Sequence, residues 1–151
     1  MRDTMNAACP RPAAEALPDT TMHQPVTIHL PVLPAPSMSA NGRSRGNWQG
    51  HAYDAADVLR SCTYWLRHHY PGLSVPTPVS IAVCVTWPTG RRRYDVDSLA
   101  SLVKQHQDAL VVCGVLDGDG PNQIVRATYA QRRQDKHHDP GVMFVITRET
   151  T

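Results

Sequence analysis

The feature that most constrains the fold is a change in the spacing of apolar residues along the chain. Between residues 79 and 85, Val and Ile alternate with smaller side chains, and Pro88 ends the run. This period of two is typical of a strand with one buried face. Residues from about 51 to 70, and from near Asp97 to Gly114, instead have apolar side chains at helical spacing. A strand between two such helices predicts a sheet with helices packed on it.

Three further segments complete the predicted sheet, namely residues 26–30, 124–132 and 142–147. The order is then strand, helix, strand, helix, strand, strand. This order predicts an α+β fold with one mixed sheet of about four strands packed on two helices. Residues 1–24 contain several prolines and no periodic apolar pattern, so we expect a disordered N-terminal extension. Residues 25–151 form the predicted domain.

Composition limits the class of protein. The chain has 151 residues, of which 41% are hydrophobic, which is enough for one core without disulfides. The four cysteines form no CxxC pair, which disfavours a zinc knuckle and fits a reducing, cytoplasmic compartment. Cys84 and Cys113 lie in apolar stretches and are expected to be buried thiols. No signal peptide or membrane-spanning apolar run is recognisable, so no membrane partner is expected.

Asp95-Val96-Asp97 is the first candidate for chemistry. In extended backbone, side chains at i and i+2 point to the same face, so two carboxylates could share a divalent cation. Mg²⁺ prefers such hard oxygen ligands. By themselves the two residues have a simpler interpretation, with Asp97 as a helix cap and Asp95 in a turn.

Two further elements follow the DxD sequence. Lys104 comes seven residues after Asp97, which is about two helical turns and nearly the same face. A lysine there could stabilise a phosphate or a leaving oxygen, although it could equally be an ordinary exposed helical lysine. Residues 116–120 then place Asp117 and Asp119 in a glycine-containing loop, which by itself is also typical of a simple turn.

Arginine dominates the basic residues, since 13 of the 15 are Arg. Arginine makes bidentate contacts with phosphate. Arg91, Arg92 and Arg93 directly precede the DxD sequence, and Arg43 with Arg45 occupies a Pro- and Ser-rich loop. Both groups are candidates for DNA contacts, and a solvated loop is the alternative for each.

His137-His138-Asp139, close to Asp135, is the remaining cluster of chemical interest. These residue types bind metals, but they show no regular ligand spacing. A solvated hairpin loop is therefore the favoured interpretation.

In combination, the basic run, the DxD sequence, the helix with a lysine, the glycine turn and the acidic loop resemble the RusA family of Holliday junction resolvases. The matching stretches are RRRYDVDSL, KQHQDAL and GVLDGDGPNQIV, with TIHLPVLPAPSMSANGR upstream. The resemblance covers residues 26 to 148.

The resemblance implies a RusA-like nuclease domain. Asp95, Asp97 and Asp119 match the family's catalytic, metal-binding carboxylates, and Lys104 matches its helix lysine when counted back from Asp108. Asp117 is a second candidate for the third carboxylate. The implied protein is a homodimer that binds Mg²⁺, or Mn²⁺ as a substitute. It nicks four-way DNA junctions symmetrically during recombination and repair in a bacterial or phage-encoded system.

The chain departs from the family pattern in three places. Ser98 replaces an Asn after the DxD sequence, Gly118 replaces the first acid of an Asp-Asp pair, and the segment before Lys104 is longer by close to one helical turn. A non-catalytic branched-DNA-binding module with the same fold is therefore the alternative. An enzyme acting on small nucleotides is a third option, but no Gly-rich phosphate loop supports it.

Overall fold

A computed structural model describes residues 24–39 and 48–150 of the chain. Its four strands form a single sheet in the order β1-β4-β2-β3. The strands are β1 (Val26–Leu30), β2 (Val79–Trp87), β3 (Ile124–Arg133) and β4 (Gly141–Arg148). β4 is antiparallel to both β1 and β2, whereas β3 is parallel to β2. The predicted mixed four-stranded α+β fold is therefore confirmed.

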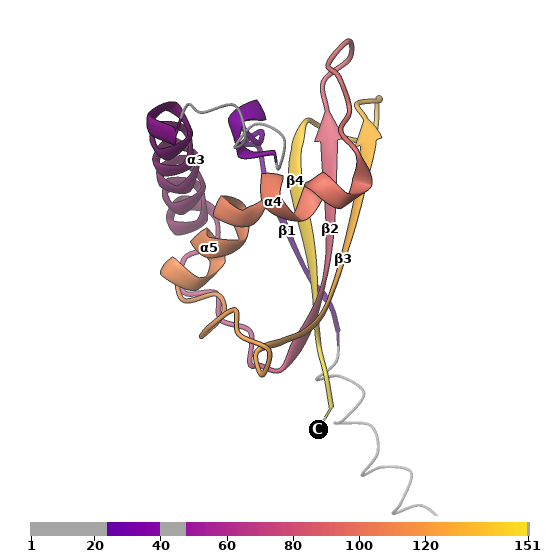
Figure 1. Cartoon of the computed structure of the whole chain (residues 1–151). Coiled ribbons are helices and arrows are strands. Elements are labelled where there is room, and N and C mark those ends of the chain that lie inside the picture. Colours follow the sequence, from indigo (N-terminus) through magenta and orange to yellow (C-terminus); the bar gives the residue numbers. More distant parts are fainter. Residues whose placement is uncertain (1–23, 40–47, 151) are drawn as a thin grey trace, which may run out of the picture.

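The helices lie on one side of this sheet (Figure 1). The long helix α3 spans Trp48–His69, and α5 spans Lys104–Val112. Shorter segments are η2 (Pro36–Met38), η3 (Val96–Ser98) and α4 (Leu99–Leu102). β2 explains this one-sided arrangement, because its alternate residues from Val79 to Trp87 are buried while Ala82 between them is exposed.

The core lies between the helices and the sheet. Phe144, Ile28 and Trp87 supply its largest strand side chains, and Leu66 and Leu110 pack on it from α3 and α5. Burial of this apolar surface is the main free-energy gain of folding. The opposite face of the sheet is not covered by any helix of the described segments.

Two glycines are required by the backbone. Gly114 follows α5 with a φ of 75°, a conformation that favours glycine, and so it ends the helix as predicted. Gly141 begins β4, and a Cβ there would lie 2.3 Å from the carbonyl oxygen of Leu30. The close approach of β1 to β4 therefore depends on glycine at this position.

Cys84 and Cys113 are half-buried, so the expectation that both are fully buried is wrong. Cys84 points away from the helices, on the less covered face of β2, because it alternates with the buried valines. The expected extension, residues 1–24, lies almost wholly outside the described residues.

Candidate active site

The DxD sequence follows the end of β2 but does not continue its extended backbone. Asp95 has a φ of −64° and a ψ of 145°, and it precedes the 3-10 helix η3, which contains Asp97. The expectation that both carboxylates project from one extended segment is therefore wrong, because the chain turns into a helix after Asp95. Both side chains are exposed, and neither has a hydrogen bond or ion pair with another described residue. They remain available to a cation or to water.

Gln131 of β3 anchors the segment just before Asp95. Its side-chain oxygen accepts hydrogen bonds from Trp87 Nε1 (2.9 Å) and from the backbone nitrogen of Tyr94 (3.2 Å). Its side-chain nitrogen donates to the backbone oxygen of Tyr94. The rings of Trp87 and Tyr94 lie with centroids 5.3 Å apart. One side chain thus satisfies a buried indole and both backbone groups of Tyr94, and so holds the start of the DxD sequence against the sheet.

The basic run lies between β2 and the DxD sequence. Arg92 and Arg93 are exposed, and none of Arg91, Arg92 and Arg93 forms an ion pair with another described residue. Arg133 Nη1 donates to the backbone oxygen of Arg91 (3.2 Å), which ties this run to the end of β3. The other predicted DNA-binding residues, Arg43 and Arg45, lie outside the described residues.

The helix expected from Asp97 to Gly114 is interrupted. Val103, with a φ of −97° and a ψ of 6°, separates α4 from α5, and Lys104 begins the second of these helices. The prediction that Asp97 and Lys104 share one face of a continuous helix is therefore wrong. Leu99, Leu102 and Val103 are all fully buried, which indicates that packing of the apolar side chains sets this local geometry.

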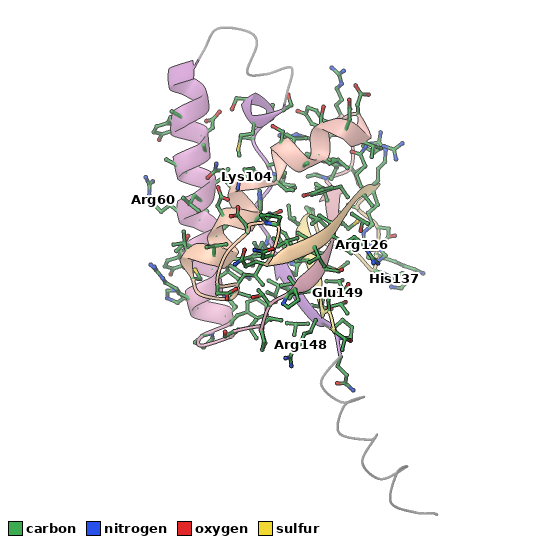
Figure 2. The ribbon with its side chains drawn as sticks, turned by 60° about the horizontal axis from the view of Figure 1, so that its bottom comes forward. Arg60, Lys104, Arg126, His137, Arg148 and Glu149 are labelled. Carbon is green, nitrogen blue, oxygen red and sulfur yellow. The ribbon has the colours of Figure 1, made fainter. Side chains whose placement is uncertain are left out.

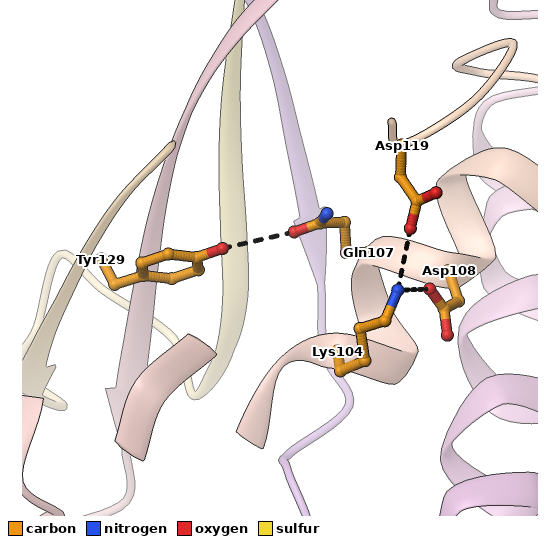
Figure 3. A network of polar contacts seen from close by, with 5 residues as sticks. All are labelled: Lys104, Gln107, Asp108, Asp119 and Tyr129. Atoms are coloured by element: carbon orange, nitrogen blue, oxygen red, sulfur yellow. Dashed lines mark hydrogen bonds and ion pairs between the residues drawn. The ribbon is translucent and has the colours of Figure 1, made fainter. Parts of the chain in front are cut away.

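Lys104 is the centre of an ion-pair network (Figure 3). Its Nζ donates to Asp119 Oδ2 at 2.8 Å and also to Asp108, one turn along α5. The side chains of Lys104 and Asp119 are 45% and 41% exposed, so the pair is accessible from solvent. The structure thus brings together two of the four predicted catalytic residues, Lys104 and Asp119, from segments fifteen residues apart.

This network shifts the pKa of Lys104 and that of Asp119 in the direction of the charged form. Partial burial lowers the pKa of Lys104, but the hydrogen bonds and charges of Asp108 and Asp119 outweigh that effect and raise it overall. The hydrogen bond from Lys104 lowers the pKa of Asp119. Near neutral pH the site therefore contains the Lys104 cation paired with the Asp119 carboxylate.

Asp117 has a different partner from Asp119. Its Oδ1 accepts a hydrogen bond from Thr77 Oγ1 at 2.9 Å, close to the start of β2. This distinguishes the two candidates for the third carboxylate, because of Asp117 and Asp119 it is Asp119 that contacts Lys104.

Three residues near this site were not predicted from the sequence, namely Asp108, Gln131 and Tyr129. Tyr129 of β3 donates from its hydroxyl to Gln107 Oε1 at 3.5 Å, and burial raises its pKa. Asp108 was recognisable as a carboxylate four residues after Lys104, at the spacing of helical ion pairs. Gln131 and Tyr129 carry no such signal, because their contacts are with segments distant in the sequence.

The donor chemistry of the site suits Mg²⁺, but its geometry is not that of a closed metal cage. Within residues 24–39 and 48–150, no group of three or more His, Cys, Asp or Glu side chains is placed to hold a metal ion. Mg²⁺ usually takes only one or two protein carboxylates, together with water and substrate phosphate. Asp95 and Asp97 fit that limited requirement, whereas Asp119 is occupied by Lys104.

Comparison with known families and with curated proteins found no match for this chain. The chain matches no family model and no curated protein. None of the helices in the described segments combines the length and apolar character needed to span a bilayer.

Proposed function

We propose that this chain is a Mg²⁺-dependent, structure-selective DNA endonuclease that resolves four-way junctions by paired symmetric nicks. It would serve DNA recombination and repair in the cytoplasm of a bacterium, encoded by the cell or by a phage. The proposal rests on the resemblance of the motifs to the RusA family and on the placement of the corresponding residues.

The contact between Lys104 and Asp119 is the observation that carries the proposal. The resemblance matches these two residues to catalytic positions, and they form an exposed ion pair at 2.8 Å. A lysine beside carboxylates on an open surface is suited to contact a phosphate oxygen, because the ammonium group compensates negative charge. It would stabilise negative charge on the scissile phosphate or on the leaving oxygen.

Asp95 and Asp97 are the residues best suited to hold the cation, since both carboxylates are exposed and have no partner among the described residues. A bound Mg²⁺, or Mn²⁺ in its place, would supply an activated water and charge stabilisation at the phosphate. Asp119 is the third candidate ligand, and it would have to exchange its contact with Lys104 to take that role. Arg91, Arg92 and Arg93 would position the DNA backbone.

Two symmetric nicks in one junction require two active sites related by a two-fold axis. Each chain carries one set of these residues, so we propose a homodimer as the active form.

A non-catalytic branched-DNA-binding module is the second candidate. Two observations favour it. Asp119 is engaged in an ion pair with Lys104, and the residues that the structure describes contain no three-carboxylate group placed to hold a metal ion. Such a module would bind junctions without cutting them in Mg²⁺ or Mn²⁺.

The Asp97→Asn variant tests both candidates. It keeps the shape of the side chain but removes one metal-ligating charge, so it should bind a four-way junction at least as tightly as the unmodified protein and fail to nick it in Mg²⁺. The affinity should still fall steeply with salt, because counterion release from phosphate contacts is unchanged. Gel shift and cleavage are measured on one preparation, with Asp57→Asn on the exposed surface of α3 as the matched control.

Full cleavage by Asp97→Asn would refute its role as a metal ligand. Binding without cleavage by the unmodified protein, in both Mg²⁺ and Mn²⁺, would instead support the non-catalytic module. A linear duplex in parallel reactions reports whether the activity is selective for branched DNA.

A further inference from the structure

A small pocket of about 200 Å³ lies where the loop between β3 and β4 meets the sheet. We call it the β3–β4 loop pocket. Strands β1, β3 and β4 each contribute one lining residue, and the β3–β4 loop contributes the others. The lining residues are His29, Arg132, His137, His138, Asp139 and Met143.

The β3–β4 loop pocket lies on the face of the sheet opposite the helices. Arg132 pairs with Thr86 in the β2–β3 register, and His29 pairs with Met143 in the β1–β4 register. Paired residues point to the same face, and these positions alternate with the buried core positions of each strand. Figure 2 shows His137 on the side of the molecule away from α3.

Arg132 brings the one guanidinium among the lining residues to the pocket. Its Nε donates to Thr86 Oγ1 at 2.9 Å, which fixes the guanidinium, and it has no ion pair with any residue of the described segments. The remaining N–H groups of the guanidinium are therefore open to another acceptor. An arginine fixed in this way is suited to bidentate recognition of a phosphate or carboxylate.

The histidines of the loop are held in place by Asp135. Its Oδ1 accepts from the backbone nitrogen of His137 and contacts His138 Nδ1, both at 2.8 Å. The Nε2 of His138 is left as the free polar atom of that ring. From β1, His29 adds a ring whose buried Nε2 has no hydrogen-bond partner among the described residues. Asp139 is the one carboxylate among the lining residues, against one arginine and three histidines.

These residue types also occur in metal sites, but the geometry does not support one here. None of the His and Asp side chains in the described segments forms a group of three that could hold a metal ion. The fixed arginine points to an anion, since a guanidinium has donors only and repels cations.

The pocket lies at the same end of the sheet as the basic run, which leads to the DxD sequence. The backbone nitrogen of Gln134 donates to the oxygen of Trp87 at 2.8 Å, and Arg133 contacts the backbone of Arg91. The β3–β4 loop is thus joined directly to the segment that carries the basic run and leads to Asp95. DNA bound by the basic run would therefore lie near this loop.

We propose that the β3–β4 loop pocket binds a phosphate group of the DNA backbone, outside the catalytic residues. This inference rests on the proposed function for its source of phosphate, because the same chemistry would also accept a free phosphate compound. Arg132 is the principal ligand, and the histidines of the loop add hydrogen bonds. The contact would help to hold a junction arm in register with the active site.

The test uses the full chain in two arms. In the first, inorganic phosphate is titrated at constant ionic strength while the histidine ring signals are followed by NMR. In the second, affinity for a four-way junction is measured across a range of salt concentrations. Each arm compares Arg132→Gln with Arg126→Gln, a matched control on the same face of β3 that does not line the pocket. A His137→Gln/His138→Gln double variant tests the pocket independently, should Arg132→Gln unfold the chain.

We expect phosphate to shift the ring signals saturably in the unmodified protein and in Arg126→Gln, but not in Arg132→Gln. Junction affinity should fall about five- to tenfold in Arg132→Gln, with a salt slope smaller by about one, as for the loss of one phosphate contact. Equal losses in the two arginine variants would overturn the proposal, because they would reflect general charge alone. Phosphate binding without any junction binding would assign the pocket to a free phosphate compound and overturn its assignment to DNA. The missing junction binding would, by itself, also contradict the proposed function.

Discussion

Lys104 contacts two carboxylates at once, and those contacts differ in origin. Asp108 is one helical turn away and would meet Lys104 in any intact helix. Asp119 reaches Lys104 only because the loop after Gly114 returns toward α5. The second contact is therefore specific to the tertiary structure, and it distinguishes Asp119 from Asp117, whose partner is Thr77.

From this difference we predict that Asp119→Asn abolishes junction cleavage, whereas Asp117→Asn reduces it only modestly. Asp119 lies beside Lys104 at the candidate site, and Asp117 is held near the start of β2. Because the ion pair is exposed, its loss should lower the free energy of unfolding by no more than about 1 kcal/mol. Cleavage rates in Mg²⁺ and thermal unfolding are measured for both variants. The opposite ranking of activities would make Asp117 the third catalytic carboxylate.

At the level of secondary-structure elements, the DxD sequence depends on β3 for its position. The segment between β2 and η3 has no regular structure of its own, and Gln131 holds it through Tyr94 and Trp87. Trp87 is fully buried, so its indole N–H needs this acceptor. Gln131 is thus a positioning residue for Asp95 and Asp97, acting through the backbone of Tyr94.

We predict that Gln131→Leu lowers the free energy of unfolding by about 1–3 kcal/mol, because it leaves the indole of Trp87 without a partner. Cleavage by the folded variant should fall more than junction binding does, since the DxD segment loses its anchor while the arginines remain. Gln134→Leu is the control, because only the backbone of Gln134 takes part in the described contacts. Unchanged cleavage by folded Gln131→Leu would argue against the positioning role.

Across the whole molecule, His106 links the helical layer to the chain leaving β1. It is fully buried on α5, and its Nε2 donates to the backbone oxygen of Val32 at 2.7 Å. Burial lowers its pKa from 6.5 to about 4, although the hydrogen bond to Val32 opposes that shift. The folded protein therefore keeps this ring neutral at pH values where the unfolded chain protonates it.

This difference predicts a loss of stability as the pH falls from 6.5 to about 4. In that window the unfolded state binds a proton that the folded state does not, which amounts to about 3 kcal/mol over the full range. His106→Gln, which keeps an N–H donor, should show a smaller decrease over the same window. Chemical denaturation at several pH values measures this, with the exposed His68→Gln as control. Identical pH profiles for His106→Gln and the unmodified protein would contradict the assignment.

The sequence by itself determined the type and order of the main elements. The four strands and the two long helical segments follow from apolar spacing and from breakers such as Pro88 and Gly114, because those signals act over a few residues. The interruption at Val103 was not predictable from local spacing, since the apolar pattern continues across it. Tertiary packing decided that feature.

For the candidate site, too, some features follow from the sequence and others only from the tertiary structure. The carboxylates, the lysine and the basic run were recognisable as residue types at informative spacings, and their assignment as catalytic residues stays a prediction. Only the tertiary structure decided which of them meet. It paired Lys104 with Asp119, placed Asp97 in a 3-10 helix, anchored Tyr94 through Gln131 and set Arg132 beside three histidines. Each of these contacts joins segments far apart in the chain or depends on packing, and no local sequence pattern encodes such pairings.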